Sequence, residues 1–180
     1  MEKLTKVEVA GRLIDAAIDL LFAEGDALAI HAIAMSAANL LSDLVERLSD
    51  EESLRHTLAA GLELSRRELV AGLNRTWNFI KHGDRDPDAV LTVDELDNDA
   101  VIFYAIIESW KIGEPTQRMM IFLLWYHARK PPIDEPDSRF TAFARCSFPL
   151  LYELPRSEQL RIGAKEVREL QQFQRASDAA

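Results

Sequence analysis

The sequence predicts an all-α protein, folded as a single-domain bundle of six or seven helices. Apolar residues recur at helical spacing from Val7 to Phe22 and again from Ala27 to Leu48. Glycine and proline residues separate most of the later periodic stretches. The 180 residues suit one domain, because domains most often have about 100 to 150 residues. We predict that this domain covers residues 1–176 and that the tail 177–180 is disordered.

The composition is that of an ordinary globular protein, with 48% hydrophobic and 28% charged residues. The formal net charge of −9 argues against indiscriminate binding to nucleic acid or anionic membranes, although it allows a local basic site. The single cysteine, Cys146, excludes an intramolecular disulfide and a zinc site built from several thiolates. Because Cys146 lies between Phe143 and Phe148, we expect it to be buried.

No part of the chain is predicted to enter a membrane. The longest apolar stretch, Met119–Tyr126, is shorter than the roughly 20 residues that a membrane span needs. Charged residues interrupt the apolar positions of the first predicted helix, which distinguishes it from a signal peptide. We therefore expect a soluble cytoplasmic protein with no membrane partner.

The first two predicted helices form a hairpin. Gly25 ends the first helix, and Asp26 caps the second. The second helix carries many alanines, which let neighbouring helices approach closely, and an alanine-rich pair offers a flat surface for a twofold partner. We therefore expect a homodimer. The apolar stripe of the second helix consists of Ile30, Ile33, Ala37, Leu40, Leu41, Leu44 and Leu48.

A long third helix is predicted from Glu51 to about His82, bent near Gly61. Ser49 and Glu52 have the spacing of a capping box, in which the serine hydroxyl and the glutamate carboxylate satisfy free backbone amides. Gly83 is well placed to end the helix. The residues expected on its inner face are Leu62, Leu69, Leu73, Thr76 and Ile80.

The acidic stretch 84–99 contains seven carboxylates and one arginine around a short apolar run, which predicts an extended loop or one short strand. Helices are then expected at about 95–112, 116–129, 138–151 and 155–175. Aromatic residues of these helices are expected in the core, and stacking on a nucleic-acid base is the alternative. They are Trp110, Phe122, Trp125 and Tyr126.

Three polar residues near the end of the long predicted helix are the best candidates for a site. Arg75, Asn78 and His82 lie on one helical face, because successive residues turn by about 100°. Arginine binds a phosphate through two parallel hydrogen bonds, and imidazole exchanges a proton near neutral pH. Together these groups are the minimum for metal-independent attack by a ribose 2′-hydroxyl on the neighbouring phosphate. All three are therefore candidate catalytic residues.

A structural role is the alternative for the same residues. His82 near a helix C-terminus would compensate the helix dipole, and Arg75 or Asn78 would bond Asp84 or Asp86. The histidines lack metal-ligand spacing, and the chain has no phosphate-binding glycine loop. The sequence therefore predicts neither a metal site nor a cofactor.

The segment Asn74–Asp88, NRTWNFIKHGDRDPD, together with the alanine-rich helix upstream, resembles a group of bacterial helical proteins related to the HEPN superfamily. The resemblance covers about Asp26 to Pro115, and its motif is an N-x-x-x-H element followed by an R-D-P loop. It implies a HEPN-like fold. HEPN ribonucleases use an arginine and a histidine separated by a short spacer, often on paired protomers, and Arg75 and His82 match that pattern. Thr76 departs from it, since Asn, Asp or His usually follows the arginine.

A calcium site is a second chemistry for the acidic loop. Its oxygen-bearing residues have the spacing of an EF-hand-like loop, in which alternating ligands wrap one hard cation. Ala89 stands where such a loop uses a glycine with positive φ, so a solvated acidic loop is the alternative. The ligands at positions 1, 3, 5, 7, 9 and 12 would be Asp84, Asp86, Asp88, the Val90 carbonyl, Thr92 and Glu95.

Three functional hypotheses follow. The leading one is a non-enzymatic interaction or regulatory module with a HEPN-like fold and an unidentified ligand. RNA or another protein is the expected class of partner, beside a second copy of the chain. The second is a metal-independent HEPN-type endoribonuclease or RNA-binding protein that uses Arg75 and His82. The third is a calcium-binding helical protein that uses the loop 84–95.

Overall fold

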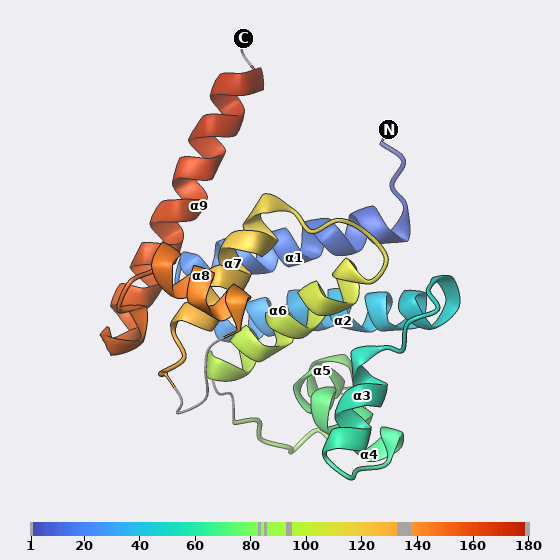
Figure 1. Ribbon diagram of the computed structural model, residues 1–180. Helices are drawn as coiled ribbons and strands as arrows, with labels where there is room; N and C mark the ends of the chain where they lie inside the picture. Colours follow the sequence, from blue (N-terminus) through green and yellow to red (C-terminus); the bar gives the residue numbers. More distant parts are fainter. Residues whose placement is uncertain (1, 83, 85, 93–94, 133–137, 179–180) are drawn as a thin grey trace. The chain divides into compact units, whose positions relative to one another are not determined.

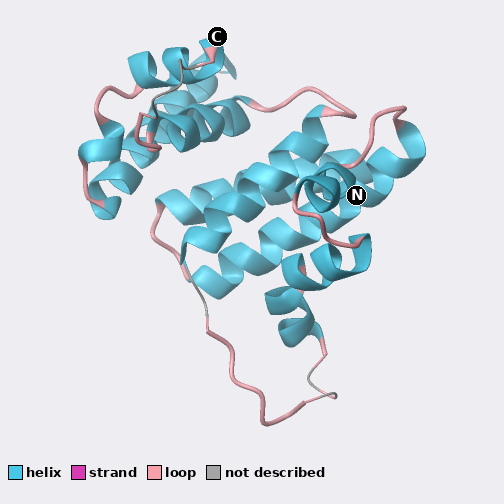
Figure 2. Cartoon of the chain, turned by 60° about the horizontal axis from the view of Figure 1, so that its bottom comes forward, coloured by secondary structure: helices cyan, strands magenta, loops and turns pink. Residues whose placement is uncertain are grey.

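The computed structural model describes residues 2–82, 84, 86–92, 95–132 and 138–178, with the side chains of 95–97 and 178 left undescribed. All regular elements among these residues are helical (Figure 2), which confirms the predicted all-α class. In chain order (Figure 1) they are α1 (Lys6–Phe22), α2 (Ala27–Leu48), α3 (Leu54–Gly61), α4 (Arg66–Leu73), α5 (Arg75–Lys81), α6 (Glu95–Trp110), α7 (Gln117–Ala128), α8 (Arg139–Ser147), the 3-10 turn η1 (Leu151–Glu153) and α9 (Arg156–Asp178).

The described part of the chain holds nine α-helices where six or seven were expected. The main reason is that the long helix predicted over 51–82 is three short helices, α3, α4 and α5. Glu63 interrupts the chain after α3 with a φ of 53°, and Ser65 then starts α4 with a capping box to Glu68. Asn74, at φ −91° and ψ 8°, is both the C-cap of α4 and the N-cap of α5.

The capping box predicted at Ser49 and Glu52 is wrong. Ser49 is instead the C-cap of α2, and its hydroxyl accepts a hydrogen bond from the Glu51 amide at 3.0 Å. At the start of α3 the capping acceptor comes from another helix, because the Glu108 carboxylate accepts the Leu54 amide at 2.6 Å. A contact distant in sequence has therefore replaced the local cap.

The chain forms two compact units, and α1 contributes residues to both. Unit 1 consists of residues 1–17 and 26–115, and unit 2 of residues 18–25 and 116–180. The single domain expected over 1–176 stays a prediction. In the expected tail 177–180, residues 177 and 178 continue α9, and 179–180 lie outside the described residues.

In unit 1, α2 packs against α6 along an apolar seam. Asp26 caps α2 as predicted, by accepting the Ala29 amide at 2.9 Å. The buried face of α2 is rotated from the expected stripe, because Leu48 is 67% exposed whereas Met35 and Val45 are fully buried. Fully buried seam residues include Ala34, Ala38, Leu41, Ile102, Ala105 and Ile106.

The inner face expected for the third helix is mostly wrong. Leu69 is buried, but Leu62 is 59% exposed and Ile80 is 43% exposed. The breaks at Glu63 and Asn74 reset the helical register, so residues spaced for one continuous helix no longer share a face.

In unit 2, α7 and α9 pack with the last turn of α1 around Trp125. The Trp125 indole is fully buried and donates a hydrogen bond to the Gln159 carbonyl at 2.8 Å. Phe22 meets the Trp125 ring edge-on at a centroid distance of 5.1 Å. The core prediction is thus confirmed for Phe122 and Trp125, whereas Trp110 of unit 1 is 45% exposed.

Cys146 is exposed, contrary to the prediction. The helix α8 buries Ala144, and Phe148 follows it four residues later on the same side. Cys146 lies between these two positions in sequence and therefore on the opposite side of the helix.

The helix α2 is long and apolar enough, by length and composition, to cross a membrane. Half of its most apolar window is buried within the protein. The core helix of a soluble protein meets the same criterion, so the finding is compatible with a soluble chain.

Candidate functional site

A groove in unit 1 is formed by α5, its C-cap and the loop that follows. Its volume is about 370 Å³. The helix and its C-cap supply four of the lining residues, and the loop supplies Asp86 and Ala89–Leu91. The lining residues are Arg75, Asn78, Phe79, His82, Asp86, Ala89, Val90 and Leu91.

The three candidate residues from the sequence line this groove together. Arg75 and Asn78 are exposed, and His82 is half-buried. Within the described part of the chain, no hydrogen bond or ion pair engages the side chains of these residues. A structural role would require bonds from Arg75 or Asn78 to Asp84 or Asp86. Such bonds are not formed among the described residues. A guanidinium, an amide and an imidazole thus face one open space.

His82 lies just after the last turn of α5, at φ −120° and ψ 59°. Its backbone amide donates to the Asn78 carbonyl at 3.0 Å and closes the helix. The imidazole therefore sits at the negative end of the helix dipole, as the structural alternative proposed. The same position also brings it to the groove, so dipole compensation and ligand contact are compatible. Gly83, expected to end the helix, lies outside the described residues.

A partly buried amide pair orients α5. The Asn39 side chain of α2 donates to the Asn74 carbonyl oxygen Oδ1 at 2.7 Å, and Asn74 Nδ2 donates to the Val70 carbonyl at 3.0 Å. Asn74 is 9% exposed and directly precedes Arg75. Because both ends of the Asn74 amide are bonded, α2 fixes the direction in which α5 leaves α4.

Phe79 is a groove residue that the sequence analysis missed. Its side chain is 38% exposed, and it lies four residues after Arg75 on the same face of α5. An exposed aromatic ring beside an arginine is suited to stacking on an unpaired base. Of the four aromatic residues first considered for stacking, Phe122 and Trp125 are fully buried and cannot do so, whereas Trp110 and Tyr126 lie outside the groove lining. Helical spacing from Arg75 was the signal that would have identified Phe79.

The acidic loop gives the calcium hypothesis no added support. Asp84 and Asp88 are exposed, and Val90 is 89% exposed. Among the described residues, positive φ at a non-glycine occurs at Glu24, Glu63 and Leu150, so Ala89 lacks the turn conformation of an EF-hand. No cluster of three metal-ligating side chains occurs in the described part, but the Glu95 side chain lies outside it. Calcium binding stays a prediction.

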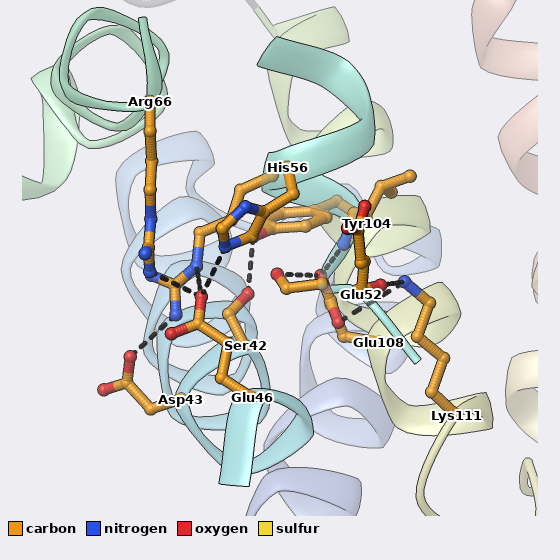
Figure 3. A network of polar contacts seen from close by, with 12 residues as sticks. Ser42, Asp43, Glu46, Glu52, His56, Arg66, Tyr104, Glu108 and Lys111 are labelled. Carbon is orange, nitrogen blue, oxygen red and sulfur yellow. Dashed lines mark hydrogen bonds and ion pairs between the residues drawn. The ribbon is translucent and has the colours of Figure 1, made fainter. Parts of the chain in front are cut away.

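A polar network joins α2 to α3 and α4 (Figure 3). Arg55 donates to Asp43 at 2.8 Å and to Glu46 at 2.9 Å, and Arg66 donates to the same Glu46 oxygen at 2.5 Å. Burial alone would raise the pKa of Glu46, but the hydrogen bond to Arg66 and the charge of Arg55 outweigh burial and lower it. His56 adds a fourth contact, with Nε2 at 3.4 Å from Glu46.

A second part of the network lies deeper, between α3 and α6 (Figure 3). The fully buried Glu108 carboxylate accepts a hydrogen bond from Ser53 at 2.8 Å. Its other oxygen lies 3.9 Å from Lys111, which donates to the Glu52 carbonyl at 2.6 Å. Tyr104 and Ser42 share a hydrogen bond of 2.5 Å, and burial raises the pKa of Tyr104. No local sequence pattern predicts these contacts, because most of the residues that form them lie far apart along the chain.

The groove is the feature that brings the predicted site residues together, and the network is the feature that anchors the helices around it. The resemblance to HEPN proteins rests on the sequence motif from Asn74 to Asp88 and stays a prediction. No protein-family model, no curated protein and no solved structure matches this chain.

Proposed function

We propose that this chain is an interaction module of the HEPN type that binds single-stranded RNA in the α5 groove. The observation that supports this most is the presence of Arg75, Asn78 and His82 on one groove, without a competing side-chain partner among the described residues. An arginine with no carboxylate bound to it retains its donors for a phosphate. A cytoplasmic location and a dimeric state belong to the same proposal.

The groove offers complementary contacts for one nucleotide. Arg75 binds the phosphate through two N–H groups, and Phe79 stacks on the base. Asn78 lies between them in the sequence and presents both a donor and an acceptor to a base edge or a sugar hydroxyl. Binding is therefore expected at an unpaired segment, because the bases of a duplex are already stacked.

The charge of the chain limits the proposal to a local contact. With a net charge of −9 and Asp86 in the groove, the protein repels a long polyanion outside the immediate site. Affinity should therefore depend weakly on salt. For one neutralised phosphate in a single strand, raising the salt from 50 to 200 mM should lower the affinity by about threefold.

Fluorescence anisotropy with a labelled single-stranded RNA of about ten nucleotides tests this proposal. Arg75→Ala should weaken binding by about tenfold or more, because it removes a charge-assisted hydrogen-bond pair. Arg67→Ala is the matched control, since Arg67 is an exposed arginine of α4 outside the groove lining. Equal losses in both variants, or no binding by the wild type at any accessible concentration, would refute RNA binding in the groove.

Metal-independent RNA cleavage is a second candidate function. It is favoured by one observation, the presence of His82 beside Arg75 in the groove lining. In this reaction His82 accepts the proton of a ribose 2′-hydroxyl, whose oxygen attacks the adjacent phosphorus. Arg75 stabilises the developing charge on the phosphate. The bond to the 5′-oxygen breaks, that oxygen takes a proton from water, and the products are a 2′,3′-cyclic phosphate and a 5′-hydroxyl.

Cleavage is tested in the presence of a metal chelator, with gel analysis of the product ends. His82→Ala should abolish cleavage while leaving the fold intact, and Lys81→Ala should retain it, because Lys81 is an exposed neighbour outside the lining. A substrate with 2′-deoxyribose at every position should bind but remain whole. Binding without cleavage in the wild type would leave the non-enzymatic module as the function and exclude the nuclease.

A further inference from the structure

The helix α2 carries a polar stripe that contacts each of the three short helices after it. Asn39, Asp43 and Glu46 are spaced by four and three residues, so they lie along one face of α2. Asn39 bonds Asn74 at the junction of α4 and α5, and Asp43 and Glu46 bond Arg55 of α3. Glu46 also bonds Arg66 at the start of α4.

Few apolar residues of these short helices are fully buried, and the others inside them that are not exposed are half-buried. Within α3, α4 and α5, all of whose residues are described, Ala59 and Leu69 are the buried apolar residues. Several large apolar side chains of the same segment remain exposed: Leu62, Leu64, Phe79 and Ile80. Polar contacts to α2 are therefore an important part of what attaches this segment.

The first residues of the segment are held separately. The Ser53 hydroxyl and the Leu54 amide both donate to Glu108 of α6, which is fully buried. This point of attachment involves α6 and not the stripe of α2. It therefore remains when the stripe contacts break, and it can serve as a hinge.

We propose that Asn39, Asp43 and Glu46 form a polar latch on α2, whose opening releases α3–α5 about Ser53 while α2 and α6 stay packed. Because Arg75, Asn78 and His82 lie on α5 and its C-cap, the latch also sets the position of the groove. The proposal concerns the fold alone and holds whether or not the groove binds RNA.

The contacts at Arg55 indicate why loss of a latch residue has a local effect. The Arg55 side chain is 9% exposed and lies between the two carboxylates of the latch. Burial lowers the pKa of Arg55, but the hydrogen bond to Asp43 and the charge of Glu46 outweigh it and raise the pKa. If Glu46 is replaced by a neutral residue, the charged Arg55 loses its more buried partner. The free energy of the open segment, in which Arg55 is in water, then falls relative to that of the closed segment.

Hydrogen–deuterium exchange read by mass spectrometry tests the latch without RNA. In Glu46→Gln, exchange over 54–81 should accelerate by about tenfold or more, while exchange over 27–48 and 98–110 changes by less than about twofold. Glu158→Gln on α9 is the matched control, because Glu158 forms an exposed ion pair with Arg161 in unit 2. Unchanged exchange over 54–81, or equal acceleration throughout unit 1, would overturn the proposal.

A second variant and a salt series test the latch even if Glu46→Gln does not fold. Asp43→Asn changes a carboxylate that is 71% exposed, so the chain should tolerate it, and exchange over 54–81 should rise by about threefold. In the wild type, 1 M NaCl should accelerate exchange over 54–81 and leave α2 and α6 protected, because salt screens partly exposed pairs. A wild-type segment indifferent to salt, together with an unaffected Asp43→Asn variant, would also overturn the latch.

Discussion

The side chain of Asn39 on α2 donates a 2.7 Å hydrogen bond to Asn74, the residue directly before Arg75. The bond connects positions that are 35 residues apart, and it holds the junction at which α4 ends and α5 begins. Asn74 is nearly buried, so water cannot readily replace Asn39 as its partner. The orientation of the candidate site therefore depends on a residue outside the groove.

Substitution of Asn39 should destabilise unit 1 measurably. Asn39→Ala leaves the buried carbonyl of Asn74 without a donor, and the free energy of unfolding should fall by about 1–3 kcal/mol. Urea titration followed by circular dichroism measures the change. Ser36→Ala is the control on the same helix, because the Ser36 hydroxyl bonds only the Ala32 carbonyl of its own helix. A loss no greater than that of the control would mean that the amide pair contributes nothing.

The stability of unit 1 should fall in acid because of Glu46. Its pairing with Arg66 and Arg55 lowers its folded pKa below the ordinary value of 4.5. A group with a depressed folded pKa contributes stability above the ordinary pKa, and this contribution is lost as the pH falls through the folded pKa. Urea titrations from pH 7 to pH 3 should therefore show a smaller loss of stability in Glu46→Gln than in the wild type. Identical pH profiles for the two proteins would contradict this assignment.

In unit 2, His127 should titrate below the ordinary histidine pKa of 6.5. Burial is the main cause of the lowered pKa, and the positive charge of Lys130 is the second. A lowered folded pKa means that the neutral ring is favoured, so its contribution to stability is present above pH 6.5 and is lost as the pH falls toward the folded pKa. Proton NMR should show this pKa, and Lys130→Ala should move it upward. A downward movement in that variant would contradict the role of Lys130.

Two glycines should respond in opposite ways to alanine. A Cβ at Gly163 of α9 would lie 2.2 Å from the Phe22 ring, which is packed against Trp125 and cannot move aside cheaply. Gly163→Ala should therefore destabilise the protein by about 1–3 kcal/mol. Gly72 of α4 has no atom within 4 Å of the added Cβ, so Gly72→Ala should stabilise by about 0.5–1 kcal/mol. Thermal unfolding measures both variants, and destabilisation by Gly72→Ala would contradict the open surroundings of that site.

Local signals in the sequence predicted the helical class and much of the element order. The helix α2 occupies the predicted range Ala27–Leu48, because Asp26 is a strong local cap and no breaking residue interrupts the run. Helical periodicity gave a wrong prediction over 51–82, where one long helix was expected and three short helices are found. The Ser65 and Glu68 capping box was present in the sequence, but the helical periodicity on both sides concealed the break at Glu63. The Ser49 and Glu52 pattern had the correct spacing and yet forms no cap, because Glu108 starts α3 from another helix.

The candidate site also has features that the sequence predicts and features that it does not. Helical spacing predicted that Arg75, Asn78 and His82 would share a face, and they line one groove because α5 keeps its helical geometry between them. Spacing within one helix could not predict that Asn39 would orient α5 or that Glu46 would bind both Arg55 and Arg66. Those contacts depend on how α2 packs beside the short helices, and that arrangement is a property of the tertiary fold.

RNA binding in the α5 groove is tested most directly by a titration of ¹⁵N-labelled protein with single-stranded RNA, followed by two-dimensional NMR. The amides with the largest shifts should cluster in α5 and in the loop residues that line the groove, Asp86 and Ala89–Leu91. In the same titration of Arg75→Ala, these amides should shift much less at equal RNA concentration, because the variant binds about tenfold more weakly. Shifts confined to unit 2, or an identical response in Arg75→Ala, would contradict the claim that the α5 groove is the RNA-binding site.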